Sequence, residues 1–308
     1  MESSKPVGVC INIMKIAILG AKGYLGLRFT EFKSNKNIIQ IPISRSMFNY
    51  HDPIILRQII RGKGLDGILN CAGFTGRPNV DNCEEHKDMC YKLNVELPET
   101  IAKVCFDEKK LFFQIGSGCI YQGGLSSIDP SLGYKEEDEP NLSFDHPPCS
   151  YYSGTKAEME KRIRKVPGVS IFRLRMPFSS LKDDRNLICK LAKYQKILEA
   201  SNSITFIDEF ISKTLGMIAS RVPSGIYNVT NPGVVSNLEL AKLLWERKIR
   251  HSEPKVFETT QDIKSVMRSP RSSCVLDSSK IASLGFGMSN VHEALNKCIN
   301  QMDELKSA

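Results

Sequence analysis

The sequence predicts an α/β protein in which a doubly wound parallel sheet is followed by a smaller C-terminal lobe. Strand and helix patterns alternate through the first half of the chain. A glycine-rich turn, Gly20-Ala-Lys-Gly-Tyr-Leu-Gly26, joins the first strand to the first helix. Such alternation is typical of a parallel sheet with helices on both faces. Together with the glycine spacing, it indicates a Rossmann-like fold.

The elements of the first part follow from hydrophobic patterning. Met14 to Leu19 is a short apolar run that ends at glycine, as is typical of a buried strand. The residues that follow have the pattern of a helix. By the same reasoning we expect strands at 15–19, 38–43, 66–71, 110–116 and 169–175, and helices at 24–34, 53–61, 84–107 and 151–166.

The character of the chain changes near Pro177, where strands become sparse and Pro, Ser and Asn separate the helices. We predict a Rossmann domain at 14–176 and, at 177–308, mainly a substrate-binding lobe over the ligand cleft, beyond the carboxyl ends of the strands. The segment 123–150 should be a mobile loop beside that cleft. In the second part we expect helices at 186–199, 237–250 (with Asn237 as N-cap) and 290–305, and a strand at 225–229 that returns to the sheet.

The glycine turn predicts a dinucleotide site. Gly20 allows the tight turn, Gly23 lets the backbone approach a pyrophosphate, and Gly26 allows close packing of the helix. Unpaired N–H groups at the helix N-terminus would hold the phosphates. The cofactor-binding residues expected from this turn are Gly20, Lys22, Gly23, Tyr24, Leu25 and Gly26.

The end of the second strand indicates which dinucleotide binds. An acidic residue there would accept a hydrogen bond from the ribose 2′-hydroxyl of NAD. Here the strand runs into Ser44-Arg45-Ser46, and Lys22 adds a second cation. Arginine and serine suit a 2′-phosphate, so NADPH is favoured over NADH. The alternative is that Arg45 is a solvated loop residue.

Composition limits the class of protein. The 308 residues, 41% hydrophobic and 25% charged, are ordinary for a soluble globular protein. Neither a long apolar run nor a signal peptide is apparent, so we expect no membrane segment and a cytoplasmic location; Met14 could be an internal start. The net charge of +8 is spread along the chain, which predicts no nucleic-acid partner but suits an anionic nucleotide sugar.

Ten cysteines occur without a CxxC pair, which indicates reduced thiols and not a disulfide framework. Cys83, His86 and Cys90 have the spacing of one helix face. No fourth zinc ligand is apparent, so no metal site is predicted.

Tyr152 and Lys156 are one turn apart on a predicted helix and therefore share a face. A nearby ammonium would lower the pKa of Tyr152, which could then protonate a carbonyl oxygen while hydride reaches the carbon. Ser117, at a strand end, would hydrogen-bond the same oxygen, and Lys156 would hold the nicotinamide ribose. Following a glycine turn, this set predicts a reductase.

Cys119 lies two residues after Ser117 and is not needed for hydride transfer. In a 4-keto sugar the protons on C3 and C5 are acidic, and their removal gives an enolate that Tyr152 and Ser117 could stabilise. Cys119 could be the base if a neighbouring cation keeps it partly as thiolate. Lys190 is the candidate acid on the opposite face. The alternative is that Cys119 is a buried small hydrophobe.

Several segments resemble a known family: Asn70-Cys-Ala-Gly-Phe-Thr-Gly-Arg-Pro-Asn-Val-Asp81, Gly118-Cys-Ile-Tyr121, Tyr152-Ser-Gly-Thr-Lys156, and Gly225-Ile-Tyr-Asn-Val-Thr-Asn-Pro-Gly-Val-Val235. The chain resembles extended short-chain dehydrogenases/reductases. More narrowly, it is similar to the bifunctional UDP-4-keto-6-deoxyglucose 3,5-epimerase/4-reductases of plants and giant DNA viruses, which complete UDP-L-rhamnose synthesis.

The resemblance implies NADPH-dependent 3,5-epimerisation and 4-keto reduction of UDP-4-keto-6-deoxyglucose. It assigns reduction to Ser117, Tyr152 and Lys156, and epimerisation to Cys119 and Lys190. It also implies a separate 4,6-dehydratase that supplies the substrate, and a homodimer. Other residues that it implies are Asn70, Ala72, Gly73 and Pro177 at the cofactor, and Arg77, Asn94, Arg185, Asn186 and Arg271 at the substrate.

Two alternatives to this function stay open. One is a 4-keto-6-deoxy nucleotide-sugar reductase without epimerase activity, and the other is a non-catalytic NADP-binding regulatory subunit. The choice between UDP and dTDP sugars is also open.

Overall fold

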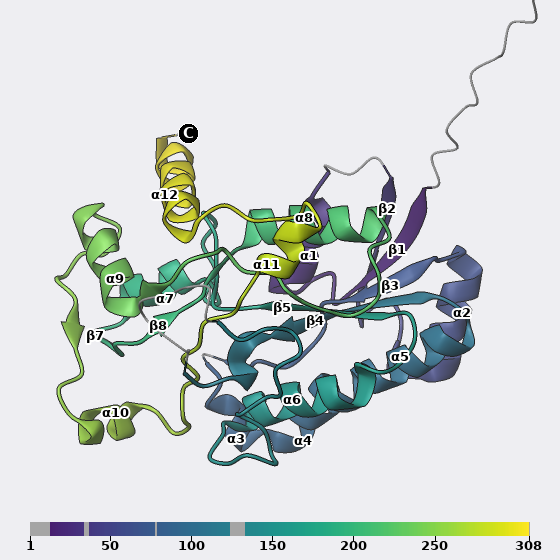
Figure 1. Ribbon diagram of the computed structural model, residues 1–308, viewed down its shortest axis with the longest axis horizontal. Helices are drawn as coiled ribbons and strands as arrows, with labels where there is room; N and C mark the ends of the chain where they lie inside the picture. The colour runs from purple at the N-terminus through teal and green to yellow at the C-terminus, as the bar shows by residue number, and fades with distance from the viewer. Residues whose placement is uncertain (1–12, 34–36, 78, 124–132, 308) are drawn as a thin grey trace, which may run out of the picture.

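The structure, a computed structural model, describes residues 13–33, 37–77, 79–123 and 133–307. Its central sheet consists of β1 (Met14–Leu19), β2 (Ile38–Ile43), β3 (Gly67–Asn70), β4 (Leu111–Ser117), β5 (Val169–Leu174) and β10 (Ile226–Asn228). The order across the sheet is β10-β5-β4-β3-β1-β2, and every neighbouring pair is parallel (Figure 1). The predicted parallel α/β architecture is confirmed.

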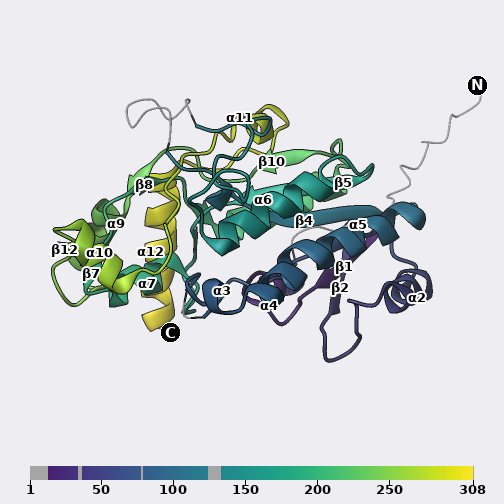
Figure 2. The same cartoon turned by 90° about the horizontal axis from the view of Figure 1, so that it is seen from below.

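Helices cover both faces of this sheet (Figures 1 and 2). One face carries α1 (Tyr24–Glu31), α8 (Ile207–Ala219) and α11 (Ser279–Ser283), and the other carries α2 (Pro53–Lys63), α5 (Leu97–Asp107) and α6 (Tyr151–Ile163). On the first face Phe29 meets Phe210 edge to face, with ring centroids 5.9 Å apart. On the second face Leu56, Ile101 and Met159 are fully buried. The two cores hold the sheet rigid from both sides.

The strand order reverses at β1, which lies between β2 and β3. The chain passes from β1 outward to β2 and then crosses back to β3 on the other side. The loops that follow β1 and β3 therefore part at this point and leave a crevice beyond the strand ends. Open α/β sheets bind their ligands in such a crevice.

The prediction of a single helix at 84–107 is wrong. The segment forms α3 (Asn82–Glu85), α4 (Lys87–Tyr91), a π-helical turn (Lys92–Glu96) and α5. His86 separates α3 from α4 with φ −124° and ψ 53°, outside the helical region. Pro98, in the first turn of α5, has no N–H to donate, so the carbonyl of Asn94 loses its ordinary helical partner. A local widening of the helix precedes that proline.

The C-terminal lobe packs around α7 (Leu187–Lys193), α9 (Asn237–Glu246) and α12 (Val291–Ser307), with α10 (Thr260–Val266) at its edge (Figure 2). Ile188, Leu244 and Leu295 form part of its buried core. Short strands complete this part of the chain: β6 (Pro177–Phe178), β7 (Lys196–Ile197), β8 (Ser201–Asn202), β9 (Thr205–Phe206), β11 (Val235–Ser236) and β12 (Lys255–Val256).

Several boundaries differ from those predicted. The helix expected at 186–199 ends at Lys193. The N-cap of α9 is Ser236 and not Asn237, because the Ser236 hydroxyl accepts a hydrogen bond from the Glu239 N–H at 3.0 Å. Residue 34 of the predicted helix 24–34, and residues 124–132 of the expected loop, lie outside the described residues.

Strand β10 lies at the edge of the central sheet, although it comes after the first elements of the C-terminal lobe. Its Tyr227 stacks on Phe172 of β5, with ring centroids 5.9 Å apart. The chain after Pro177 therefore contributes both to the sheet and to the lobe.

Candidate active site

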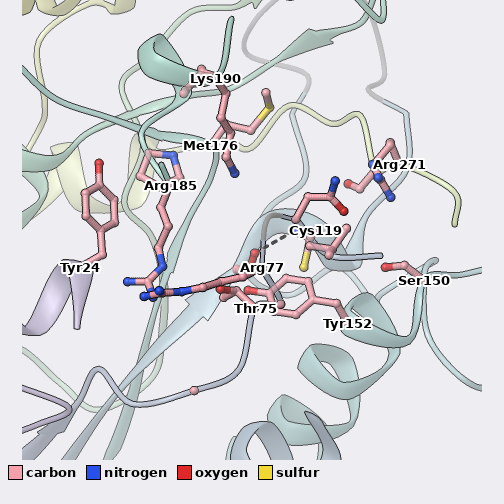
Figure 3. A pocket seen from close by; sticks show the side chains of 18 of the residues that line it. Tyr24, Thr75, Arg77, Cys119, Ser150, Tyr152, Met176, Arg185, Lys190 and Arg271 are labelled. Atoms are coloured by element: carbon pink, nitrogen blue, oxygen red, sulfur yellow. Dashed lines mark hydrogen bonds between the residues drawn. The ribbon is translucent and has the colours of Figure 1, made fainter. Parts of the chain in front are cut away.

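A cavity of about 1290 Å³ opens beyond the carboxyl ends of the parallel strands, between the sheet and the C-terminal lobe (Figure 3). Its lining includes Gly20 after β1, Cys71 after β3, Ser117 at the end of β4 and Arg175 after β5, together with α7 and α10 of the lobe. Pockets for one small molecule usually have about 300–1,000 Å³. The cavity is therefore large enough for a dinucleotide and a second ligand.

The glycine turn forms one end of this cavity. Gly20 has φ +74°, a left-handed conformation, and a Cβ there would lie 2.7 Å from the Ala72 backbone nitrogen. A Cβ on Gly26 would lie 2.2 Å from the Gly20 carbonyl oxygen. Gly26 consequently serves packing and does not line the cavity. The cavity is lined instead by Gly20, Lys22, Gly23, Tyr24 and Leu25.

The N-terminus of α1 faces the cavity without a side-chain cap. Gly23 is the N-cap and offers no side chain to bond the N–H groups of the first turn. Those N–H groups and the positive end of the helix dipole are suited to a phosphate. This arrangement fits the pyrophosphate of a dinucleotide.

A group of hydroxyls and cations follows β2 in the same cavity. The hydroxyl oxygens of Ser44 and Ser46 are 2.9 Å apart, and the Lys22 ammonium donates to Ser46 at 3.2 Å. Arg45 lines the cavity beside them. Burial lowers the pKa of His51, as does Arg45, so this ring favours its neutral form. The only carboxylate among the described cavity-lining residues is Asp262 of α10, so none follows β2, and the donor set fits a 2′-phosphate.

Asn70 is placed differently from its predicted cofactor-binding role. Its side chain is fully buried and does not line the cavity. Its amide donates to Gln114 at 2.8 Å, and its carbonyl oxygen accepts from the Ala72 N–H at 3.0 Å. Asn70 therefore supports the loop of Ala72 and Gly73, and those two residues line the cavity with Pro177.

Ser117, Tyr152 and Lys156 all line the cavity. The Ser117 hydroxyl accepts from the Cys119 N–H at 3.2 Å, which fixes the turn after β4. Helix α6 begins at Tyr151 because the Ser150 hydroxyl caps the Ser153 N–H at 3.1 Å. The Lys156 ammonium donates to the Ile115 carbonyl at 3.4 Å and lies 5.9 Å from the centroid of the Tyr152 ring.

Burial is the main cause of the pKa shifts of Tyr152 and Lys156. It raises the pKa of Tyr152 well above its ordinary value, although the Ser117 hydroxyl opposes that shift. The expected lowering of the Tyr152 pKa is therefore wrong in direction. Burial likewise lowers the pKa of Lys156. Tyr152 is held as a neutral phenol, the form that can give a proton.

Cys119 lies beside Tyr152, and Lys190 comes from α7 on another wall of the cavity (Figure 3). Burial raises the pKa of the Cys119 thiol, while Ser117, Arg175 and Lys156 lower it. Burial lowers the pKa of Lys190, and Arg185 and Arg271 add to that shift. Both pKa shifts favour the neutral form of the side chain, the thiol of Cys119 and the amine of Lys190. The two residues line the same cavity and come from different elements.

Of the residues expected to bind the substrate, Arg77, Arg185 and Asn94 line the cavity but differ in their hydrogen bonding. Arg77 and Arg185 line the cavity, and neither guanidinium forms a hydrogen bond or ion pair with a described residue. Asn94 also lines it, but its side-chain carbonyl accepts from the Phe74 N–H at 2.8 Å and its amide donates to the Phe74 carbonyl at 2.8 Å. Asn94 therefore positions the loop that leads to Arg77.

Asn186 does not have the predicted substrate-binding position. It is fully buried, does not line the cavity and is the N-cap of α7, where its side-chain oxygen accepts from the Ile188 N–H at 3.1 Å. Its amide donates to the carbonyls of Ser179 and Leu181 at 2.7 and 2.8 Å. These bonds use the whole side chain to hold the loop before α7.

Arg271 lines the cavity but is already paired with a residue that the sequence reasoning did not single out. Its two terminal nitrogens donate to the two carboxylate oxygens of Asp81 at 2.7 and 2.6 Å. The Ser269 hydroxyl adds a bond to Asp81 at 2.9 Å. The resulting contact, which we call the 81–271 latch (Asp81, Ser269 and Arg271), ties the lobe to the loop after β3.

Two further cavity residues, Arg175 and Met176, were missed. Met176 has φ +40°, which is strained for a side chain of this size and marks the bend between β5 and Pro177. Arg175 is a buried cation at the end of a central strand. That position, together with the unusual Arg-Leu-Arg strand, was the signal that could have identified it.

The described residues contain no group of three or more His, Cys, Asp or Glu side chains that could hold a metal. Cys83 and Cys90 lie on α3 and α4, which His86 separates, so the shared helix face expected for this trio is wrong. In the same described ranges, no helix has the length and apolar character that crossing a membrane requires.

Comparison with known proteins gives consistent matches. The family model described as RmlD substrate binding domain matches residues 14–304. A bifunctional dTDP-4-dehydrorhamnose 3,5-epimerase/dTDP-4-dehydrorhamnose reductase of Arabidopsis thaliana is 36% identical over 245 residues, which are 78% of this chain and 79% of that protein. A trifunctional UDP-glucose 4,6-dehydratase/UDP-4-keto-6-deoxy-D-glucose 3,5-epimerase/UDP-4-keto-L-rhamnose-reductase of the same plant is 34% identical over 93% of this chain. The chain spans 42% of the length of that relative.

Solved structures share the fold. The UDP-rhamnose synthase of Acanthamoeba polyphaga mimivirus has a TM-score of 0.84 and 23% identity, over 94% of this chain and all of that one. A dTDP-4-dehydrorhamnose reductase of Bacillus anthracis in complex with NADP has a TM-score of 0.74 and 18% identity, over 94% of this chain and 98% of that one.

Proposed function

This chain belongs to the RmlD substrate binding domain family, and from that premise we propose that it converts UDP-4-keto-6-deoxy-D-glucose to UDP-L-rhamnose. The proposed reaction inverts C3 and C5 and then reduces the 4-keto group with NADPH. The observation that carries this proposal is that a single cavity is lined by a reductase set, Ser117, Tyr152 and Lys156, and by a second acid–base pair, Cys119 and Lys190.

In the reduction, Tyr152 acts as the general acid. It is a neutral phenol, and the 4-oxygen of the sugar becomes basic enough to take its proton as hydride reaches the carbon. Ser117 donates a hydrogen bond to the same oxygen and keeps it in line with Tyr152. Lys156 supplies a fixed donor at the cofactor ribose, held by the Ile115 carbonyl. The bound NADPH supplies the hydride.

In the epimerisation, the thiolate form of Cys119 removes a proton from the carbon next to the 4-keto group. The electron pair of the broken C–H bond moves to the 4-oxygen, where Tyr152 and Ser117 stabilise the enolate. Protonated Lys190 then returns a proton to the opposite face of that carbon, and the centre is inverted. Both centres flank the same carbonyl, so one pair can serve both inversions, provided that Cys119 gives its proton to solvent and Lys190 takes one from solvent between them.

The residues at the ends of β1 and β2 support NADPH as the cofactor. The open N-terminus of α1 would hold the pyrophosphate, with Ala72 and Gly73 beside it. Arg45 and Ser44 would hold the 2′-phosphate, with Lys22 nearby. The UDP group of the substrate would lie toward the lobe, where Arg77 and Arg185 have guanidinium groups available for phosphate. A 4,6-dehydratase activity, present in the trifunctional plant relatives, would supply the 4-keto sugar.

A reductase without epimerase activity is the second candidate. The observation in its favour is the burial of Cys119, which raises the pKa of the thiol and opposes its use as a base. The bifunctional relative of 36% identity argues for the fuller activity.

The deciding experiment uses the wild-type protein with UDP-4-keto-6-deoxyglucose and NADPH in deuterated water. Proton NMR of the product is read at C3 and C5. We expect deuterium at both positions and the L-rhamno configuration. Oxidation of NADPH without deuterium in the product would leave a 4-keto reductase. Binding of NADPH without turnover would leave a non-catalytic NADP-binding subunit.

A further inference from the structure

The proposed epimerisation requires Cys119 to ionise in an environment that disfavours its charge. The side chain is 6% exposed, and its neighbours Ile120, Tyr121, Ala157 and Leu276 form an apolar cluster. A thiolate in such surroundings needs a cation close by. The structure offers Lys156 and Arg175 from two different elements.

Lys156 is poorly suited to this task. Its ammonium donates to the Ile115 carbonyl at 3.4 Å and lies over the Tyr152 ring. Burial lowers the pKa of Lys156, which disfavours its protonated form. A guanidinium is planar and delocalised, carries five donors and is less strongly hydrated than an ammonium, so arginine is the cation that proteins more readily bury beside an anion.

The sheet sets Arg175 beside Cys119. In the parallel pairing of β4 and β5, Ser117 lies opposite Leu174, so the next residues, Gly118 and Arg175, leave the sheet as neighbours. A Cβ placed on Gly118 would lie 3.4 Å from the Arg175 Cδ. The glycine therefore leaves the arginine stem against the backbone that carries Cys119.

The Arg175 side chain is anchored at one end and free at the other. One terminal nitrogen donates to the Asn202 side chain at 2.6 Å and to the Ser272 carbonyl, and the backbone N–H donates to Thr205 at 3.0 Å. The Nε–H is buried without a hydrogen-bond partner among the described residues. A buried charged donor of this kind is costly unless an anion satisfies it. The anchors hold the guanidinium in place, and the Nε–H remains as a donor for a negative group.

We infer that Arg175 is a positioning residue that stabilises the thiolate form of Cys119 against the effect of burial and thereby makes it available as a base. The inference rests on the proposed function, in which Cys119 removes the sugar proton. The other titratable groups that face the sulfur are Tyr152 and Lys156 of α6 and Cys83 of α3, and Arg175 also faces Cys274. Among them only Lys156 and Arg175 bring positive charge.

The test measures the ionisation of Cys119 directly. The protein is treated with iodoacetamide from pH 6 to 10, and mass spectrometry follows alkylation of the peptide that contains Cys119. Arg175→Met removes the charge and keeps the apolar stem, Arg175→Gln keeps hydrogen-bonding capacity without charge, and Arg175→Lys restores a cation. Arg57→Met, at the surface, is the control for loss of one positive charge.

We expect Arg175→Met and Arg175→Gln to move the alkylation midpoint upward by about one pH unit, which slows alkylation near pH 7.5 about tenfold. Arg175→Lys should restore much of the loss, and Arg57→Met should match wild type. Deuterium incorporation at C3 and C5 should fall in parallel, and by a larger factor than reduction of UDP-4-keto-L-rhamnose, which needs no inversion.

An unchanged midpoint in a folded Arg175→Gln protein that binds NADPH would overturn the inference. Should Arg175→Met not fold, Arg175→Gln and Arg175→Lys still decide between charge and packing. A shifted midpoint in a protein whose wild type incorporates no deuterium would mean that the arginine acts on the thiol as inferred but that the proposed epimerisation is wrong.

Discussion

Asp81 and Arg271, 190 residues apart in sequence, are joined by two parallel hydrogen bonds beside the cavity that Arg271 lines. The pair connects the loop after β3 with the segment between α10 and the final helices. Because both residues are more than three-quarters buried, water screens their attraction less than that of a surface pair. The latch therefore ties the lobe to the loop after β3 beside the cavity.

Replacement of Asp81 should weaken the 81–271 latch. We expect Asp81→Asn to raise the KM for the sugar nucleotide severalfold, because Arg271 loses its partner, while the Kd for NADPH stays unchanged. The matched control is Glu85→Gln, which removes the neighbouring, exposed ion pair with Arg268. Steady-state kinetics and fluorescence titration with NADPH measure the two quantities. Equal effects of the two substitutions would mean that the latch has no special role.

The latch also predicts how stability depends on pH. Burial alone would raise the pKa of Asp81, but hydrogen bonds from Arg271 and Ser269 outweigh it and lower the pKa to about 2. An unfolded aspartate has a pKa of about 3.9. The stabilisation is then complete above about pH 4 and is lost as pH falls toward 2. Urea unfolding between pH 7 and pH 3 measures this. The free energy of unfolding should fall less with acidification in Asp81→Asn than in wild type.

Removal of the Tyr152 hydroxyl should abolish reduction. General acids contribute about 10²- to 10⁴-fold to rate, so Tyr152→Phe should lower kcat of NADPH oxidation by at least about 100-fold. NADPH affinity should be retained, as the ring and its packing remain. Tyr151→Phe is the control, since that neighbour on α6 lies outside the cavity lining. Turnover near the wild-type rate in Tyr152→Phe would remove Tyr152 from its role.

Cys119→Ser should stop inversion at C3 and C5, because serine is too weak an acid to form an alkoxide here. NMR in deuterated water should show no exchange, while NADPH binding stays normal. Cys274→Ser, in the same apolar cluster, controls for packing and should exchange as wild type does. Formation of the L-sugar by Cys119→Ser at the normal rate would show that another residue is the base.

Arg45 should determine the preference between the two nicotinamide cofactors. Arg45→Ala should weaken NADPH binding about tenfold, or about 1.4 kcal/mol, by loss of a cation at the 2′-phosphate. The Kd for NADH, which lacks that phosphate, should change little. Arg61→Ala, on the exposed face of α2, reports the effect of general charge loss. Parallel loss of both cofactors in Arg45→Ala would contradict this assignment.

Asn186 should matter for stability and not for substrate binding. Asn186→Ala removes an N-cap and leaves buried carbonyls without donors, so it should lower the free energy of unfolding by about 2 kcal/mol. The KM for the sugar nucleotide should be unchanged at a temperature where the variant is folded. Urea denaturation and kinetics separate the effects. A raised KM with normal stability would restore the substrate role that the sequence suggested.

These cases show which features a sequence can predict. Gly20, Ser117, Tyr152 and Lys156 act through local spacing, on a turn, a strand end or one helix face, and their common cavity follows from parallel strands that end at one edge. Asn186 was misread because an N-cap and a ligand-binding amide look alike in sequence, although the apolar Leu187 and Ile188 that follow it were a capping signal. Residue type alone does not tell which partner an amide meets.

Contacts between distant segments were the least predictable. Nothing local to Arg271 indicates that Asp81 neutralises it. The break between α3 and α4 and the π turn depend on a single backbone conformation at His86 and on Pro98, and the continuous apolar pattern of 84–107 conceals both. The pKa of Tyr152 was misjudged because burial, which depends on the whole fold, raises it more than the Ser117 hydroxyl lowers it.

The stacking of Tyr227 on Phe172 bears on how such enzymes can exchange specificity during evolution. A chain cut after residue 176 would lose Phe210 from the contact with Phe29, and β5 would become an exposed edge. The C-terminal lobe is therefore interleaved with the first part of the chain and is not a detachable tail. Recombination by swapping whole C-terminal halves would destroy the core. Replacement of the two inserted segments, β6 to β9 with α7 and β11 to α10, would instead exchange much of the lobe and leave the sheet intact.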